Sequence, residues 1–115
     1  MVIVRDTAIM VSKGETFQTL FELDKEGYKL TGAETIKFSV KARPSDKKIL
    51  LTLACGIDRL NNIVSVYGSK QEMSALDEGD YFYDLVMTLS SGARYSLIYP
   101  SPFIVKGVCY ESGNR

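Results

Sequence analysis

The sequence predicts an all-β fold, an antiparallel β-sandwich of about seven strands with one short helix. Short segments with a two-residue hydrophobic period recur along the chain, and this is the period of a strand with one buried face. Turn-forming residues separate these segments at intervals typical of all-β domains. The chain has 115 residues, of which 45% are hydrophobic, so residues 1–115 are expected to form a single domain with one core.

The chain up to residue 67 contains five predicted strands, each followed by a turn signal. They cover residues 8–11, 16–24, 36–42, 48–55 and 63–67. The third is the clearest, because Ile36, Phe38 and Val40 alternate with polar residues, as in a sheet with one face on the core and one in water. Residues 56–62, which begin at a glycine, are expected to form a loop.

A short helix is expected after the fifth strand. Ser69 and Glu72 have the spacing of a capping box, in which each side chain bonds the backbone amide of the other residue at a helix N-terminus. One or two helical turns should follow, to about Leu76, with Met73 and Leu76 facing the core.

An acidic turn and an alternating strand follow this helix. The turn is residues 77–80, and Tyr81 and Tyr83 lie on the buried side of a strand that runs to Leu89. A tyrosine directly after such a turn, with a hydroxyl able to bond the turn backbone, resembles the tyrosine corner of immunoglobulin-like sandwiches. Gly79, Tyr81 and Tyr83 are therefore predicted to form a structural corner in an immunoglobulin-like fold.

The last part of the chain is predicted to contain two short strands, residues 94–99 and 103–108. Pro100 and Pro102 bracket a break between them, since proline has no N–H to donate to a central ladder. The two ends of the chain are expected to be flexible, over residues 1–6 and 111–115.

Charge and histidine content argue against several classes of function. Fourteen basic and fourteen acidic residues cancel, which leaves no long-range attraction for nucleic acid or anionic membranes. The chain has no histidine, the commonest general base and metal ligand. No nucleophile has a base beside it and no acid pair has a recognisable spacing, so we expect a protein that is not an enzyme and that has no cofactor and no metal. No apolar run approaches the length of a membrane span, so no membrane partner is expected.

Cys55 and Cys109 are the only thiols. A disulfide between them stays open, but neither lies where an immunoglobulin domain has its inter-sheet pair. Two reduced thiols, the usual state in a cytoplasm, are favoured. The apolar segment Met1–Val4 reaches charged residues at once, so no signal peptide is expected and the protein is expected to stay inside the cell.

Four apolar residues on faces predicted to be outward form a candidate interaction surface: Ile63, Tyr67, Phe82 and Val86. Asp84 shares the outward parity of its two neighbours in this set and is expected to be an exposed carboxylate paired with a lysine or arginine. The segment Met1–Val4 is a further candidate, because an apolar extended segment could add to the sheet of a neighbouring molecule.

Five motifs occur in one order along the chain: Lys13–Phe17, Leu30–Phe38, Ser69–Leu76, Gly79–Leu85 and Phe103–Val105. This succession resembles small immunoglobulin-like proteins of phage and prophage tail modules, and the amino-terminal domain of phage upper-baseplate proteins. In those proteins a leucine-threonine-glycine-alanine corner precedes a strand, and a tyrosine-rich strand follows a short helix. The resemblance covers residues from about 12 to 105. Gly68 stands where the resembling sequences usually carry an apolar residue, which predicts a looser strand before the capping box.

The resemblance implies a structural or accessory protein of a phage or prophage tail or baseplate, which acts by protein-protein contact and passes from the cytoplasm into the virion. The implied partners are other phage tail or baseplate proteins, and a homo-oligomer is an open alternative. Neither catalytic residues nor a cofactor are implied. Two alternatives from other classes stay open: a cell-surface glycan-binding module that uses tyrosines such as Tyr95 and Tyr99, and a small intracellular inhibitor of a host protein.

Overall fold

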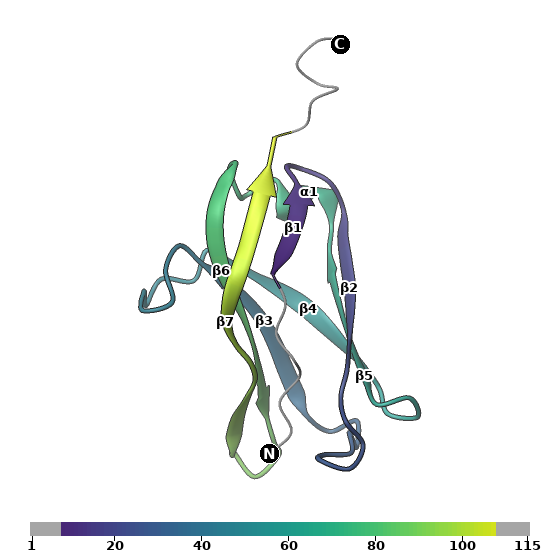
Figure 1. Cartoon of the computed structure of the whole chain (residues 1–115). Helices are drawn as coiled ribbons and strands as arrows, with labels where there is room; N and C mark the ends of the chain where they lie inside the picture. Colours follow the sequence, from purple (N-terminus) through teal and green to yellow (C-terminus); the bar gives the residue numbers. More distant parts are fainter. Residues whose placement is uncertain (1–7, 108–115) are drawn as a thin grey trace.

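The structure, a computed structural model, describes residues 8–107 and confirms the predicted fold class. These residues form an all-β, immunoglobulin-like sandwich with seven strands and one short helix (Figure 1). The elements are β1 (Ile9–Ser12), β2 (Phe17–Glu22), β3 (Thr35–Lys41), β4 (Leu51–Asp58), β5 (Ile63–Gly68), α1 (Lys70–Met73), β6 (Gly79–Thr88) and β7 (Arg94–Lys106). The predicted flexible ends, the Met1–Val4 segment and Cys109 lie outside the described residues.

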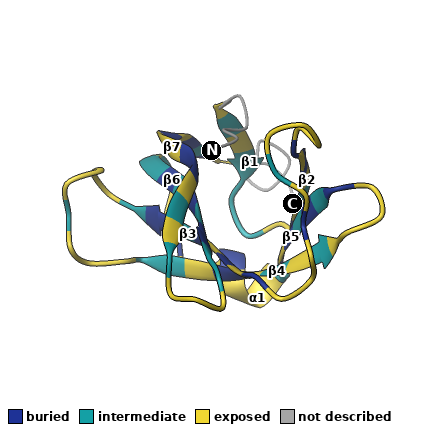
Figure 2. Ribbon diagram, turned by 90° about the horizontal axis from the view of Figure 1, so that it is seen from below, coloured by how far each residue is buried: buried dark blue, intermediate teal, exposed yellow. Residues whose placement is uncertain are grey.

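The strands follow the order β1-β7-β6-β3-β4-β5-β2, and all neighbours are antiparallel except β1 and β7. β4 belongs to both layers of the sandwich, because Leu51–Leu53 pair with β3 and Ala54–Asp58 pair with β5. The sheet therefore folds over at β4, and β2 and β5 face β3, β6 and β7 across the core (Figure 2).

Aromatic rings from both layers meet in the core. Phe17 of β2 packs against Phe38 of β3 and Phe103 of β7, with ring centroids 5.8 and 5.6 Å apart. Tyr83 of β6 stacks on Phe38 at 5.0 Å with an interplanar angle of 17°. Each such pair contributes about 0.5–1.5 kcal/mol beyond its buried area, so these rings hold the two layers together.

The strand predicted at 48–55 is present but lies further along the chain, because β4 covers Leu51–Asp58, and the loop predicted at 56–62 is wrong in its first three residues. The turn into β5 is built instead around Asp58, whose carboxylate accepts hydrogen bonds from two backbone amides that follow it. Gly56, the residue that suggested a loop, is paired within the strand, and a Cβ there would lie 2.7 Å from a serine Oγ of β5. This glycine permits a close approach between strands rather than ending one.

β7 is one continuous strand, Arg94–Lys106, so the predicted break at Pro100 and Pro102 is wrong. Within the described residues β1 pairs with β7 only from Phe103 onward, which makes the earlier part of β7 a sheet edge. Edge strands tolerate proline, because a nitrogen that faces away from the ladder has no hydrogen bond to lose. The irregularity is found instead as register shifts between β6 and β7 on either side of Leu85.

α1 begins at the predicted capping box, which the structure confirms. Ser69 Oγ accepts a hydrogen bond from the Glu72 amide at 3.1 Å, and the Glu72 carboxylate accepts one from the Ser69 amide at 2.9 Å. The helix is shorter than expected, but two turn hydrogen bonds carry the chain on to Leu76, which is buried together with Met73.

The prediction that Gly68 loosens the strand before the capping box is wrong. The residue is buried and pairs with Phe17 of β2. A Cβ at this position would lie 2.7 Å from Met73 Sδ and 3.0 Å from Leu53 Cδ1. The missing side chain therefore lets α1 pack directly onto β5, which tightens this end of the sandwich.

Two interactions hold the turn before β6 in place. The Tyr81 hydroxyl donates a hydrogen bond to the Asp77 carbonyl oxygen at 2.8 Å, the contact that characterises a tyrosine corner. Lys13, from the turn between β1 and β2, forms an ion pair with Asp77 at 3.4 Å. Gly79 opens β6, and Tyr83 lies further along it in the core, with 1% of its surface exposed.

Candidate functional site

β3 and β6 together form the floor of a groove on the outer face of the sandwich. Their antiparallel register pairs Lys37 with Val86, Ser39 with Asp84 and Lys41 with Phe82. The residues between them in sequence, such as Phe38 and Leu85, are fully buried. Because successive side chains of a strand point to opposite faces, these six side chains point away from the core.

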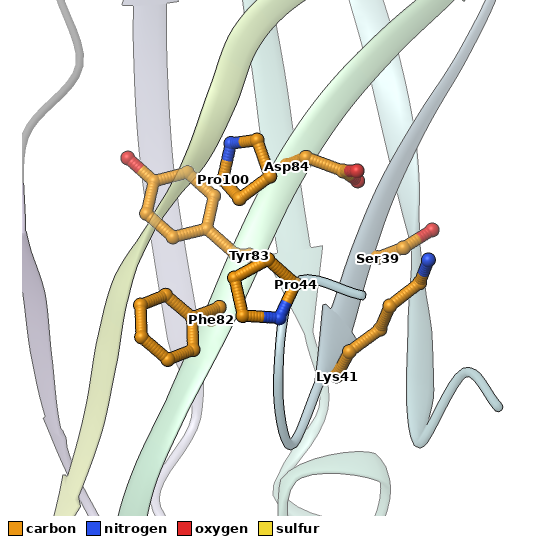
Figure 3. Close-up of a pocket in the computed structure, with 7 residues that line it drawn as sticks. All are labelled: Ser39, Lys41, Pro44, Phe82, Tyr83, Asp84 and Pro100. Atoms are coloured by element: carbon orange, nitrogen blue, oxygen red, sulfur yellow. The ribbon is translucent and has the colours of Figure 1, made fainter. Parts of the chain in front are cut away.

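The groove has a volume of about 340 Å³. Its lining combines cationic, hydroxyl and apolar side chains around one carboxylate: Lys37, Ser39, Lys41, Ile49, Asp84, Val86, Thr88 and Arg94. A recess of about 10 Å³, with room for no more than one water, adjoins it and is lined also by Phe82 and Pro100 (Figure 3). Ser39, Lys41 and Asp84 direct their polar atoms to the same side of the sheet (Figure 3).

Asp84 is half-buried and is the one carboxylate among the residues that line the groove. Burial raises the pKa of the Asp84 carboxyl, and the charges of Lys41 and Arg94 oppose this increase in part. Within the described residues the carboxylate has neither a hydrogen bond nor an ion pair, so the expected surface ion pair is not found. The Asp84 carboxylate lines the groove, where N–H or O–H donors of a bound molecule can reach it.

Asp84 lies beside an irregularity in the pairing of β6 with β7. Along β6 the pairing steps from Ser101 to Ile98 of β7, and Asp84 lies at this step with no register partner on β7. Tyr99 and Pro100 are the unpaired residues of β7 at the step. Such irregularities are common next to functional sites, and this one leaves the β7 side of Asp84 without a paired residue.

The four residues of the predicted interaction surface do not form one surface. Phe82 and Val86 lie at the groove on β6, whereas Ile63 and Tyr67 lie on β5 in the other layer. Tyr67 is 50% exposed, and near it on β2 lies Leu20, which is 60% exposed. The outer surface of the sandwich is thus divided into two patches of different chemistry.

Sequence reasoning missed the arrangement of cations around Asp84. Lys37 and Lys41 come from β3 and Arg94 from β7, while the carboxylate is on β6. The available signal was the alternation of the two lysines with buried residues, which places them on one face. Their position beside Asp84 depends on the pairing of β3 with β6, and no local pattern reports that pairing.

A second polar cluster, in the loop between β2 and β3, is closed by its own hydrogen bonds. The Glu34 carboxylate accepts a hydrogen bond from the Tyr28 hydroxyl at 2.6 Å, and others from the Thr31 and Gly32 amides at 2.8 and 3.0 Å. Burial acts to raise the pKa of Glu34, but these hydrogen bonds prevail and lower it to about 2. Burial, together with Glu34, raises the pKa of Tyr28 to about 12. Glu34 is therefore engaged in holding the loop.

Cys55 of β4 is a half-buried free cysteine, and burial raises the pKa of its thiol to about 11. At neutral pH the thiol is protonated and is a poor nucleophile. Among residues 8–107, no group of three or more His, Cys, Asp or Glu side chains is placed to hold a metal ion. In the same part of the chain, no helix has both the length and the apolar character needed to cross a membrane.

No family model matches the chain, and no curated protein matches it. A solved structure that does match is CopC from Methylosinus trichosporium OB3b, with a TM-score of 0.56 and 13% sequence identity. The match covers 93% of this chain and 95% of CopC. At this identity the similarity shows the fold alone, and it agrees with the immunoglobulin-like β-sandwich class.

The resemblance to phage and prophage tail-module and upper-baseplate proteins is wrong. The structure matches CopC over nearly its whole length, and no phage family model matches the sequence. The predicted role in a tail or baseplate, with its alternatives of a glycan-binding module and an intracellular inhibitor, is overturned by the same finding. The motifs behind the resemblance are a capping box, a tyrosine corner and strand patterns, which belong to a fold and not to one function.

Proposed function

We propose that this chain is a non-enzymatic binding module that holds an acidic segment of a partner protein in the groove over β3 and β6. The observation that carries the proposal is the half-buried Asp84 carboxylate, which has no hydrogen-bond partner among the described residues. Lys37, Lys41 and Arg94 line the same groove, and in the described part of the chain none of them forms an ion pair.

The charges of the groove favour a polypeptide with acidic side chains. Three cations and one carboxylate line it, so the groove is positive although the chain as a whole is neutral. Carboxylates of a partner would pair with the cations, and backbone N–H groups of the same segment would donate to Asp84. A nucleic-acid backbone supplies phosphate acceptors for the cations but no N–H donor for Asp84. The charge pattern therefore supports a protein partner.

Three of the shifted pKa values argue against a catalytic role for the groups concerned. Glu34 is lowered to about 2, Tyr28 is raised to about 12 and Cys55 is raised to about 11. Catalytic acids and bases are tuned in the opposite direction, toward the pH at which the enzyme works. In the groove itself burial raises the pKa of Asp84, but the lining residues include no second carboxylate and no thiol to act with it.

Titration calorimetry with a synthetic peptide of glutamate and leucine residues tests this proposal. The expected result is saturable binding that weakens as salt is added, because the groove cations are exposed enough to be screened. Lys41→Glu should weaken the binding roughly tenfold, since it places a like charge beside the ligand carboxylates. Lys70→Glu is the matched control, because Lys70 is exposed on α1 and does not line the groove.

Three outcomes would contradict the proposal. The first is equal binding of a peptide in which lysine replaces glutamate. The second is an equal loss of affinity in Lys41→Glu and Lys70→Glu. The third is tighter binding of a single-stranded oligonucleotide than of the acidic peptide.

A further inference from the structure

The outer edge of β2 is open in the described part of the chain. β2 pairs with β5 over its full length, and within residues 8–107 it pairs with no other strand. Its sequence contains no lysine, proline or glycine, and its register with β5 has no bulge. Natural sandwiches protect such edges with lysine, proline, a bulge or a covering segment. An edge strand without these devices is suited to pair with a further strand.

The backbone of β2 shows which groups face this edge. The Leu23 amide, just beyond the end of β2, donates to the Asn62 carbonyl oxygen at 2.9 Å and so points toward β5. Backbone groups of alternate residues in a strand point to alternate sides. The N–H and C=O groups of Gln18, Leu20 and Glu22 therefore point to the open side.

The side chains of the same three residues lie on the outer face, which carries an exposed apolar pair. Leu20 is 60% exposed and Tyr67 is 50% exposed. The register places Gln18 opposite Tyr67 and Leu20 opposite Ser65, so the leucine and the tyrosine are diagonal neighbours on adjacent strands. The exposed apolar surface thus continues from β5 to the open edge.

We propose that β2 is a self-association strand, which pairs antiparallel with β2 of a second copy about a two-fold axis at Leu20. In this register Leu20 lies opposite Leu20 of the second copy, and Gln18 lies opposite Glu22 of the second copy, twice. The glutamine amide donates to the glutamate carboxylate, so the polar groups that flank the leucine pair are satisfied. A closed two-fold contact of this kind yields a dimer and not a fibre.

The order of residues in β2 favours a second copy of β2 as the partner strand, and it favours one register of pairing. A shift of the pairing by two residues in either direction places Leu20 opposite Gln18 or Glu22 of the second copy, so that the leucine faces a polar side chain. The strand is therefore complementary to itself in one alignment. This inference uses neither the groove over β3 and β6 nor its ligand, so the two proposals stand or fall separately.

Light scattering over protein concentrations from about 10 μM to about 1 mM tests the proposal. The chain should pass from monomer to dimer within this range, and Leu20→Lys should raise the dissociation constant roughly tenfold or more, because two lysines then face each other. Leu60→Lys is the matched control: Leu60 is 82% exposed in the turn between β4 and β5, so the same substitution there should leave the dimer intact.

Amide hydrogen exchange tests the proposal on the unmodified chain, so the result does not depend on whether a variant folds. The amides of Gln18, Leu20 and Glu22 should become protected as the concentration rises, while those of Thr19 and Phe21, which face β5, should be protected at every concentration. Four results would each overturn the proposal. The first two are a monomer at the highest concentration and a dimer that survives Leu20→Lys. The others are an equal loss of dimer affinity in Leu60→Lys and protection of the three edge amides that does not depend on concentration.

Discussion

The two outer faces of this sandwich share a core but differ in chemistry. The face of β3 and β6 carries three cations around a half-buried carboxylate, whereas the face of β2 and β5 carries an exposed leucine and tyrosine beside an open edge. Inside, both layers contribute rings to the same aromatic cluster. The alternation of each strand thus fixes a common interior and leaves the outward positions free to differ, so each face is suited to a different partner.

The largest effect on stability should come from a change that loosens the packing of both layers together. Phe38→Ala removes a fully buried ring that touches Phe17 in one layer and Tyr83 in the other, and it should lower the free energy of unfolding by about 3–5 kcal/mol. Chemical denaturation measures this loss. Leu60→Ala, at an exposed leucine, should change stability by less than about 0.5 kcal/mol, and a comparable loss in both variants would contradict the account.

The next effect lies in the loop that joins the two layers between β2 and β3. Glu34→Gln should destabilise the protein by about 1–3 kcal/mol at neutral pH, because it removes a carboxylate that accepts several hydrogen bonds. The pKa of Glu34 is lowered from 4.5 to about 2, so its stabilisation is present above pH 4.5 and is lost as the pH falls toward 2.

Thermal melts of the parent and of Glu34→Gln over this acid range measure how the stabilisation by Glu34 depends on pH. The two curves should converge as the pH falls, and a constant gap between them would contradict the role given to Glu34. Tyr28 acts at the other end of the scale: its pKa is raised from 10.0 to about 12, so its contribution is present below pH 10 and is lost as the pH rises toward 12.

A smaller effect should be confined to the layer that contains β2 and β5. Gly68→Ala adds a Cβ that would lie 2.7 Å from Met73 Sδ and 3.0 Å from Leu53 Cδ1, and it should cost about 1 kcal/mol as the methionine shifts. Amide exchange should quicken in β5 and α1 while β3 and β6 keep their protection. Uniform loosening of both layers, or no loss of stability, would show that the close packing of α1 is not what the glycine provides.

The smallest change in stability should come from the centre of the groove. Because burial raises the pKa of Asp84, its ionised form opposes folding, and the free energy of unfolding should fall as the pH rises from the ordinary carboxyl pKa through the raised one. Asp84→Asn should therefore leave stability at neutral pH unchanged or raise it by at most about 0.5 kcal/mol. A destabilisation above about 1 kcal/mol would show that Asp84 has an internal partner.

Much of the fold could be predicted because it depends on local rules. The inward positions of Phe38 and Tyr83 follow from alternation, and α1 follows from the pair Ser69 and Glu72. The exchange of β4 between the two layers and the continuity of β7 through its prolines depend on which strands become neighbours, so they could not be read locally.

The site was less accessible to sequence reasoning for the same reason. The outward parity of Phe82 and Val86 could be read from their own strand, but the cations that share their groove come from β3 and β7. Asn62 gives a further example: its side chain is buried and bonds the Leu23 and Tyr28 carbonyl oxygens, which lie far away in the sequence. Contacts of this kind report the tertiary arrangement and leave no periodic signal.

The central claim is that the face over β3 and β6, and not the face over β2 and β5, receives an acidic partner segment. Amide chemical shifts recorded while the glutamate- and leucine-containing peptide is added test it most directly. The account predicts shifts that saturate at Ser39, Asp84 and Val86, with Leu20 and Tyr67 unmoved. Shifts confined to Leu20 and Tyr67, or no shifts at Ser39 and Asp84 at saturating peptide, would contradict it.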